Sequence, residues 1–224
     1  MIIHEHFDIN ENGHLTIGGL DSVELAEKFG TPAYIIDENA VRSRCREYLG
    51  AARSEFGEDA LVLYASKALC FTGIYKLAAE EGLGIDCVSG GELYTAKNAG
   101  FPAERIYFHG NNKTDFDISY GIDSGVGHFV VDNLTELDRI DEIAAEKGRI
   151  QPILLRLSPG IDPHTFAAVV TGKVDSKFGT AIETGQALEM VRYTLTLSNI
   201  DLKGFHCHVG SQVFGEDVYH RAAD

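Results

Sequence analysis

The sequence predicts an α/β fold, a (β/α)8 barrel of parallel strands, and three observations favour it. Apolar strand-like runs alternate with helix-like patterns along most of the 224 residues, as in sheets whose parallel strands are joined by helices. The strand-like runs are almost continuously apolar, as in strands buried on both faces. Polar and glycine-rich residues follow several different strands, whereas a doubly wound sheet concentrates its site at one switch point behind a GxGxxG turn.

The N-terminal part is predicted to hold two helices and one strand. Asn12-Gly13 is a turn signal, and Ser22–Phe29 is a short amphipathic pattern that a glycine and a proline end. Ala33–Ile36 is predicted to be a strand. Asp37 has the side chain of an N-cap for a helix over Glu38–Glu55.

Beyond this part, six strands alternate with helices. The strands are predicted over Ala60–Tyr64, Gly84–Val88, Arg105–Phe108, His128–Val131, Ile153–Leu157 and Leu202–His208. The helices between them are predicted over Phe71–Glu81, Gly91–Ala99, Leu134–Glu146 and Thr184–Leu197. A closed barrel has eight strands and about 250 residues, so we expect this chain to hold an incomplete barrel.

Composition narrows the class of protein. The chain is 44% hydrophobic and 24% charged, which is ordinary for a soluble globular domain. Its net charge of −15 disfavours nucleic acid or an anionic membrane as partner. No apolar stretch approaches the roughly 20 residues of a membrane span, and no signal peptide is evident. Four cysteines without CxxC spacing fit a reducing compartment, so we expect a cytoplasmic protein.

Lys67 is the first candidate for chemistry, because it follows the apolar run Leu61–Tyr64 at the end of a predicted strand. Partial desolvation at such a position lowers the pKa of an ammonium and leaves an amine that can form a Schiff base. Pyridoxal phosphate is the commonest aldehyde cofactor for such an amine. A lysine that only extends its charge to solvent has the same local sequence, so this motif needs support from the rest of the chain.

The string Gly204–Gln212, GFHCHVGSQ, is the second candidate. Alternate residues of a strand share a face, so His206 and His208 are expected side by side. No third metal ligand accompanies them and Cys207 points the other way, so we expect no metal site. Instead, His208 can lie against an aromatic cofactor while the following Gly210-Ser211 turn donates to an anion. His206 also fits a histidine satisfied within the barrel core.

Seven blocks, in this order and at this spacing, resemble the fold-type III pyridoxal phosphate-dependent decarboxylase family, whose barrel is of the alanine racemase-like kind. The blocks are Tyr64–Ala68, Gly84–Leu93, Phe108–Lys113, Val131-Asp132, Leu155–Leu157, Asp175–Gly179 and Gly204–Gln212. Together they are most similar to the diaminopimelate decarboxylase branch. Phe108–Lys113 and the histidine string favour that branch over ornithine decarboxylase or alanine racemase, and Ile161–Thr165 before Thr171–Lys173 agrees with it.

The resemblance implies roles for six side chains. Lys67 corresponds to the lysine that forms the Schiff base with the cofactor, His208 to the histidine that stacks on the pyridine ring, and Ser211 to a hydroxyl near the cofactor. Three further residues correspond to polar side chains around the lysine and the ring: Asp86, Glu92 and Arg156. The resemblance thus makes Lys67 and His208 the catalytic residues, with pyridoxal phosphate as cofactor and no metal.

The implied activity is decarboxylation of meso-diaminopimelate to L-lysine and CO2, by a homodimer. Residues 1–33 correspond to a segment that packs with a C-terminal β domain, and residues 34–224 to a partial pyridoxal phosphate-binding barrel. The family's Cys-Glu-Ser-Gly-Asp motif, its tyrosine near the cofactor, its glycine phosphate loop and its glutamate partner of the pyridine nitrogen lie beyond Asp224. We therefore expect the 224 residues alone to be inactive.

Three alternatives stay open at this stage. Another decarboxylase or racemase of the same fold would act on ornithine, arginine or alanine, and the residues that read the far end of the substrate lie mostly beyond this chain. A single-domain carrier of pyridoxal phosphate has about this length, although it must close its barrel within the chain. A barrel without cofactor and with an incidental lysine is the third alternative.

Overall fold

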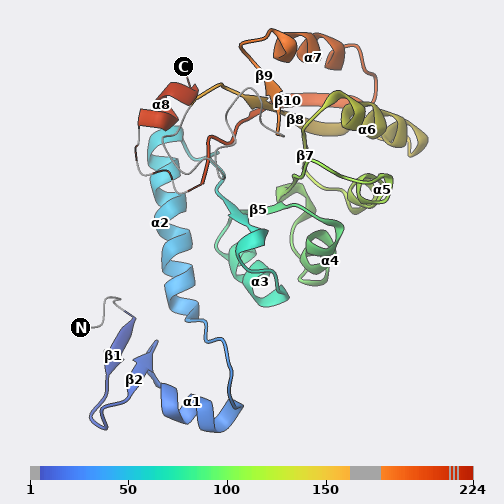
Figure 1. Cartoon of the computed structure of the whole chain (residues 1–224). Coiled ribbons are helices and arrows are strands. Elements are labelled where there is room, and N and C mark those ends of the chain that lie inside the picture. Colours follow the sequence, from blue (N-terminus) through green and yellow to red (C-terminus); the bar gives the residue numbers. More distant parts are fainter. Residues whose placement is uncertain (1–5, 162–177, 212, 214, 216, 224) are drawn as a thin grey trace.

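The computed structural model describes residues 6–161, 178–211, 213, 215 and 217–223. Its N-terminal segment is an antiparallel meander of three short strands followed by a helix, and it lies at the far end of a long helix, away from the main sheet (Figure 1). These elements are β1 (Phe7–Ile9), β2 (Leu15–Ile17), β3 (Leu20–Asp21) and α1 (Ser22–Phe29). The turn between β1 and β2 contains Gly13 with a φ of 78°, a conformation that favours glycine.

Six parallel strands form the main sheet, in the order β10-β8-β7-β6-β5-β4. Their bounds are β4 (Leu63–Ala65), β5 (Gly84–Cys87), β6 (Ile106–Phe108), β7 (His128–Val131), β8 (Gln151–Ser158) and β10 (Ile200–His206). The short strand β9 (Thr180–Ala181) pairs with β8. Because each strand lies beside the next one along the chain and runs parallel to it, the carboxyl ends of all six strands meet at one edge of the sheet.

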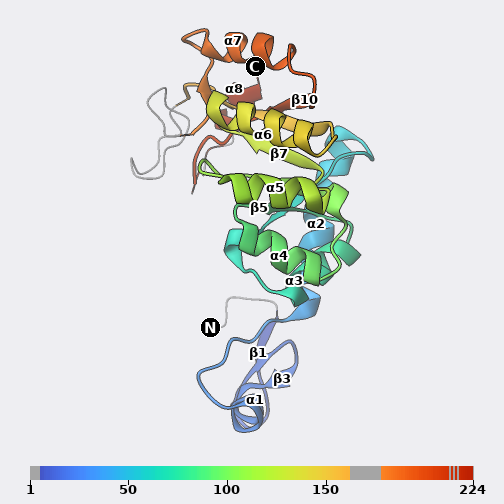
Figure 2. The ribbon, with the colours of Figure 1, turned by 90° about the vertical axis from the view of Figure 1, so that its right-hand side faces the viewer.

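Helices cover one side of this curved sheet. Figure 1 shows them on the outside of the curve, and Figure 2 shows α3 to α6 stacked along that side. These helices are α2 (Glu38–Phe56), α3 (Thr72–Glu80), α4 (Gly90–Asn98), α5 (Asp115–Ser124), α6 (Leu134–Glu146) and α7 (Gln186–Thr194), whereas α8 (Asp217–Ala223) belongs to a separate small cluster with Ile161 and Val209. The main hydrophobic core fills the space between these helices and the sheet.

The two faces of the sheet differ in chemistry. On β8, Ile153 and Leu155 are fully buried in the core under the helices, whereas Arg156 belongs to the opposite, inner face because alternate residues of a strand point to opposite sides. On β6 and β7 the inner face carries Tyr107 and His128, whose rings stack at 4.5 Å between centroids. The outer face is therefore a packed core, and the inner face carries polar and aromatic groups.

The six barrel strands and four helices predicted from the sequence are present, with ends that shift by up to three residues. The prediction of a strand at Ala33–Ile36 is wrong: no strand forms there, and Tyr34 is fully exposed. The apolar run has strand-like composition, but no other described strand pairs with it, and an isolated strand is not stable. A helix after Lys113 was left open by the sequence, and α5 occupies that position.

Candidate active site

Three of the predicted residues lie at the carboxyl ends of three strands of the main sheet. Lys67 lies in a single 3-10 turn, Ser66–Ala68, directly after β4, Asp86 is on β5 and Arg156 is on β8. The positive charges of Lys67 and Arg156 both act on the Asp86 carboxyl. The expected desolvation of Lys67 is not observed: this residue is exposed, because β4 is the outermost strand of the sheet.

We use the term mouth for the edge of the sheet where the carboxyl ends of the strands meet. Asp86 is the carboxyl at its centre. Burial raises its pKa to about 6, against the opposing effect of Lys67, and the nearby charge of Glu92 raises it further. Its Oδ1 is buried and accepts no hydrogen bond from any described residue. A buried polar atom without a partner is uncommon in folded proteins and is often part of a functional site.

Two histidines that were not predicted as site residues lie at the mouth, His109 beside Asp86 and His206 beside His109. His109 follows β6 and is 8% exposed, and its ring meets that of His206 edge-to-face, with centroids 4.8 Å apart. His109 Nε2 lies 3.9 Å from Asp86 Oδ1. Burial, reinforced by His206, lowers the pKa of His109 to about 2, and burial with Arg156 lowers that of His206 to about 4. Both rings are therefore neutral at physiological pH. Their positions at strand ends were the only sequence signal.

Arg156 and Asp132 form a second charged group at the mouth. Arg156 Nη1 lies 3.6 Å from Asp132 Oδ1, which is too long for a hydrogen bond, and the guanidinium lies over the Phe178 ring at 4.4 Å. Burial lowers the pKa of Arg156 and raises that of Asp132, while each partner opposes the shift of the other. The arrangement holds a cation on the inner face of β8.

Lys113 has a structural position. Its buried ammonium forms an ion pair with Glu136 at 2.5 Å and donates to the carbonyl oxygens of Gly110 (2.7 Å) and Val130 (2.9 Å). The cap of α5 is Thr114, and Lys113 is buried and joins the loop after β6 to the helix after β7.

Glu92 supports the turn between β5 and α4. Its carboxylate accepts a hydrogen bond from the Val88 N–H at 2.6 Å, while Ser89 caps the helix by accepting from the Glu92 N–H. These two bonds satisfy backbone donors that a helix start leaves open. The charge of Glu92 also raises the pKa of Asp86. Glu92 therefore stabilises the turn and affects the electrostatics of the mouth.

His208 and Ser211 lie in the loop after β10, which ends at His206. The expectation that His206 and His208 share one face of a strand is therefore wrong, because His208 is two residues past the strand end. Burial lowers the pKa of His208, and the charges of Arg156 and Lys67 add to this, so the ring is in the same electrostatic neighbourhood as the lysine. Ser211 is exposed, and Gln212 of the same predicted string lies outside the described residues.

The described part of the chain contains neither a metal-binding cluster nor a membrane-spanning helix. No group of three or more His, Cys, Asp or Glu side chains there could hold a metal ion. None of its helices combines the length and the apolar character needed to cross a membrane. The blocks Ile161–Thr165, Thr171–Lys173 and Asp175–Gly179 lie mostly outside the described residues.

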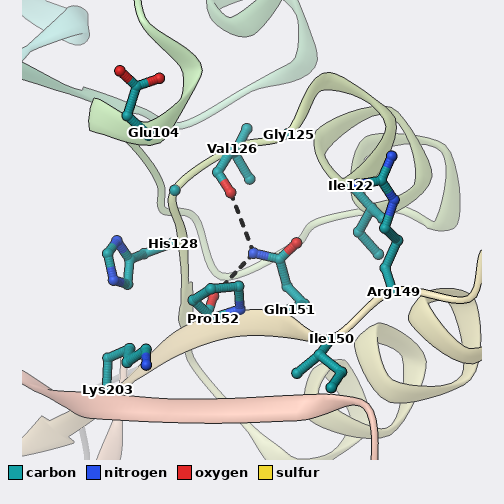
Figure 3. A pocket seen from close by; sticks show the side chains of 11 residues that line it. Glu104, Ile122, Gly125, Val126, His128, Arg149, Ile150, Gln151, Pro152 and Lys203 are labelled. Carbon is teal, nitrogen blue, oxygen red and sulfur yellow. Dashed lines mark hydrogen bonds between the residues drawn. The ribbon is translucent and has the colours of Figure 1, made fainter.

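A cavity of about 400 Å³ lies at the opposite, amino-terminal end of the strands (Figure 3). His128, Lys203 and Pro152 line it, and the Gln151 amide donates to the carbonyl oxygens of Val126 and Pro152 at 3.3 and 3.0 Å. None of the residues predicted for the site lines this cavity. His128 is therefore a half-buried histidine of the same sheet that stands apart from the mouth.

The fold and the mouth define a class of protein: an α/β barrel in which an amine, carboxyls, a guanidinium and imidazoles gather at the carboxyl ends of the strands, where barrel enzymes build their sites. Residues 40–224 match the family profile described as "Pyridoxal-dependent decarboxylase, pyridoxal binding domain". The chain belongs to this family.

Curated relatives and solved structures agree with this assignment. The chain is 47% identical over 214 residues to a diaminopimelate decarboxylase of Bacillus methanolicus, covering 96% of this chain and 49% of the relative. For the Bacillus subtilis diaminopimelate decarboxylase these values are 44% over 224 residues, 100% and 51%. A crystal structure of diaminopimelate decarboxylase from M. jannaschii matches with a TM-score of 0.86 at 37% identity, covering 96% of this chain and 50% of that one. The chain spans about half the length of the relatives it matches.

Proposed function

We propose that the protein decarboxylates meso-diaminopimelate to L-lysine and CO2 with pyridoxal phosphate as cofactor. The observation that carries the proposal is the gathering of Lys67, Asp86 and His208 at one mouth of the barrel sheet. The similarity of 41 to 47% to eight curated diaminopimelate decarboxylases supports the substrate. A solved relative is described in complex with L-lysine, the expected product.

The residues at the mouth fit the cofactor. An exposed lysine at a strand end offers an amine that an aldehyde can reach. Among the buried side-chain polar atoms that have no hydrogen-bond partner in the described residues, three belong to strand ends at this mouth: Asp86 Oδ1, Asp132 Oδ1 and His206 Nδ1. Polar atoms in this state are satisfied when a polar ligand enters.

The cofactor supplies an electron sink for the pair left behind when CO2 departs. We propose that Lys67 holds its aldehyde carbon covalently and that the His208 ring packs against its plane, which fixes the bond to be broken. The charges of Asp86 and Lys67 act on one another, so the Asp86 carboxylate would stabilise a proton on the Lys67 nitrogen. Arg156, held by Asp132 and Phe178, contributes a fixed positive charge on the inner face. Ser211 and Glu92 complete the proposed set around the cofactor.

Borohydride reduction tests the proposal directly. Protein expressed from its complete gene is reduced in the presence of pyridoxal phosphate and mapped by peptide mass. We expect a pyridoxyl adduct on Lys67, none in Lys67→Ala, and an unchanged adduct in Lys203→Ala, whose lysine lines the cavity at the other end of the strands. A wild-type protein without this adduct would contradict the proposal.

Substrate choice is tested by CO2 release from meso-diaminopimelate, ornithine, arginine and lysine in parallel. We expect turnover of meso-diaminopimelate to exceed the others, and Lys67→Ala to lower it by several orders of magnitude. Lysine/ornithine decarboxylase structures match at 25 to 27% identity, below the 37% of the M. jannaschii structure. Faster turnover of ornithine or lysine would favour a lysine/ornithine decarboxylase instead. An adduct without turnover of any substrate would favour a carrier of pyridoxal phosphate.

We also propose that the protein acts in the cytoplasm as a homodimer, and that residues 1–33 pack with a β domain. The resemblance noted from the sequence supports these points, together with the lengths of the relatives, about twice that of this chain. Light scattering of the protein from its complete gene checks the dimer: a mass of twice the polypeptide is expected, and a monomer at micromolar concentration contradicts it.

A further inference from the structure

The pair of histidines in edge-to-face contact at the mouth has no role in the function proposed above. His109 lies after β6 and His206 ends β10, so two strands that are not neighbours in the sheet bring the rings together. The rings meet edge-to-face, with 4.8 Å between centroids and 77° between planes. His109 Nε2 lies 3.9 Å from Asp86 Oδ1, near enough for a small rotation to bring the two atoms together.

The surroundings keep both rings uncharged. The charged or titratable groups that act on His109 are His206, Lys113, Arg156 and His208. Those that act on Asp86 are Lys67, Glu92, Arg156 and Lys113. Burial and the cations in these sets lower the pKa of His109, so its imidazole has one N–H donor and one acceptor nitrogen. An N–H on Nε2 faces a carboxyl oxygen that is buried and has no other hydrogen-bond donor among the described residues.

We propose that His109 is a positioning residue that orients the carboxylate of Asp86 toward Lys67. The His206 ring fixes the plane of the His109 ring, and a side-chain rotation that shortens the gap by roughly 1 Å makes the hydrogen bond. Lys67 is the strongest charge acting on Asp86, so the orientation of this carboxylate sets how well a proton is held at the lysine nitrogen. The inference rests on the proposed function, because it concerns the lysine that carries the cofactor.

The experiment follows the absorbance of the lysine-bound cofactor as a function of pH, in protein from its complete gene. A carboxylate directed at a protonated nitrogen raises the pKa of that nitrogen. We therefore expect His109→Leu to lower the titration midpoint by about one pH unit, the size of one hydrogen bond to a charged group. His109→Gln, which can place an amide N–H near the Nε2 position, is expected to restore the wild-type midpoint. His128→Leu, at the other end of the sheet, is expected to leave it unchanged.

A double variant shows whether His109 acts through Asp86. Asp86→Asn removes the carboxylate and is expected to lower the midpoint, and adding His109→Leu should lower it no further. If the leucine variant does not fold, His109→Asn replaces it, because asparagine is too short to place its amide at the Nε2 position. A normally loaded leucine or asparagine variant that titrates like the wild type overturns this inference alone. Wild-type protein without cofactor on Lys67 overturns the proposed function as well.

Discussion

At the scale of single residues, the mouth of the sheet contains charged groups that lower the stability of the fold. Asp132 and Glu136 are buried and Asp86 is half-buried, and desolvation raises the pKa of all three carboxyls. Each has a cation nearby, and the quality of that pairing differs. Glu136 is sealed against Lys113, whereas Asp86 and Asp132 keep an oxygen without a hydrogen bond. A site that must bind a charged ligand leaves such groups incompletely satisfied, and the fold elsewhere offsets the cost.

Asp86→Asn is expected to stabilise the cofactor-free protein, and more so at high pH. The pKa of Asp86 is raised from 3.8 to about 6 on folding, so its proton stabilises the native state at low pH and this stability is lost as pH rises through 6. The gain from the substitution, measured by urea unfolding, should be about 1 kcal/mol larger at pH 7.5 than at pH 5. A gain that is equal at both pH values would show that Asp86 does not titrate in this range.

Lys113→Met is expected to destabilise the protein strongly. It leaves the Glu136 carboxylate buried without its cation, which costs about 3–5 kcal/mol when one partner of a buried pair is removed. The double variant Lys113→Met with Glu136→Gln should recover a large part of the loss. Lys147→Met, which breaks a more exposed pair with Asp123, is the control and should change the free energy of unfolding much less. Equal losses for the two lysines would contradict the assignment of Lys113 as structural.

At the scale of elements, the three helices that follow β5, β6 and β7 begin with a polar cap. Ser89, Thr114 and Asn133 each accept a hydrogen bond from a backbone N–H in the first turn of α4, α5 and α6. In α5 the cap is reciprocal: the Asp117 side chain accepts from the Thr114 N–H, and its other oxygen accepts from Gly90 at the start of α4. These caps fix where each loop leaves the sheet and so place the residues of the mouth.

Thr114→Ala is expected to lower the free energy of unfolding by about 1 kcal/mol, because it removes the acceptor of the first-turn N–H. Thr95→Ala is the matched control. Thr95 lies within α4 and donates its hydroxyl to the Gly91 carbonyl, and alanine is a better helix former at such a position. Urea unfolding of the two variants at the same pH compares them. A loss at Thr95 as large as that at Thr114 would argue against a capping effect.

Much of this level of organisation was predictable, because periodicity and caps are local. Ser22–Phe29, His128–Val131 and Leu134–Glu146 have the bounds that the pattern predicts. Ala33–Ile36 was mispredicted, because strand formation depends on a partner that a local pattern does not contain. The range of α5 was missed because Gly121 and several polar residues weaken its apolar pattern.

The mouth was less predictable than the elements. The sequence singled out Lys67, Asp86 and Arg156 largely through a family resemblance, and the structure brings them to one end of the sheet. His109 was passed over because its neighbours in space, Asp86 and His206, are far from it in sequence. Long-range contacts of this kind follow from strand order and register, which a single sequence does not specify.

At the scale of the whole molecule, stability is distributed unevenly. The buried core is concentrated around β5 to β8 and their helices, whereas β1 to β3 and α1 contain no buried residue. Figure 1 shows this N-terminal segment separated from the sheet by the length of α2. Backbone hydrogen bonds with few buried apolar contacts around them open with little free energy.

Hydrogen exchange is therefore expected to divide the chain into two classes. Amides of β6 and β7 should exchange only through global unfolding, because their strands are central in the sheet. Amides of β1 and β2 should exchange by local opening, at least about 100-fold faster. Mass spectrometry of peptic peptides measures both classes in one experiment. Equal protection in the two regions would show that the N-terminal segment is held by contacts beyond those within this chain.

The alternation of side chains along β8 has a genetic consequence. Ile153, Leu155 and Leu157 pack toward the helices, while Arg156 lies between them on the inner face. Odd-numbered positions of this strand are therefore constrained by folding, and the even-numbered position Arg156 is constrained by function. Substitutions at odd positions should lower the amount of folded protein in the cell. A substitution at Arg156 should instead lower the activity of each folded molecule. A mutational scan that scores abundance and growth separately would then show, on this strand, two interleaved profiles with a period of two residues.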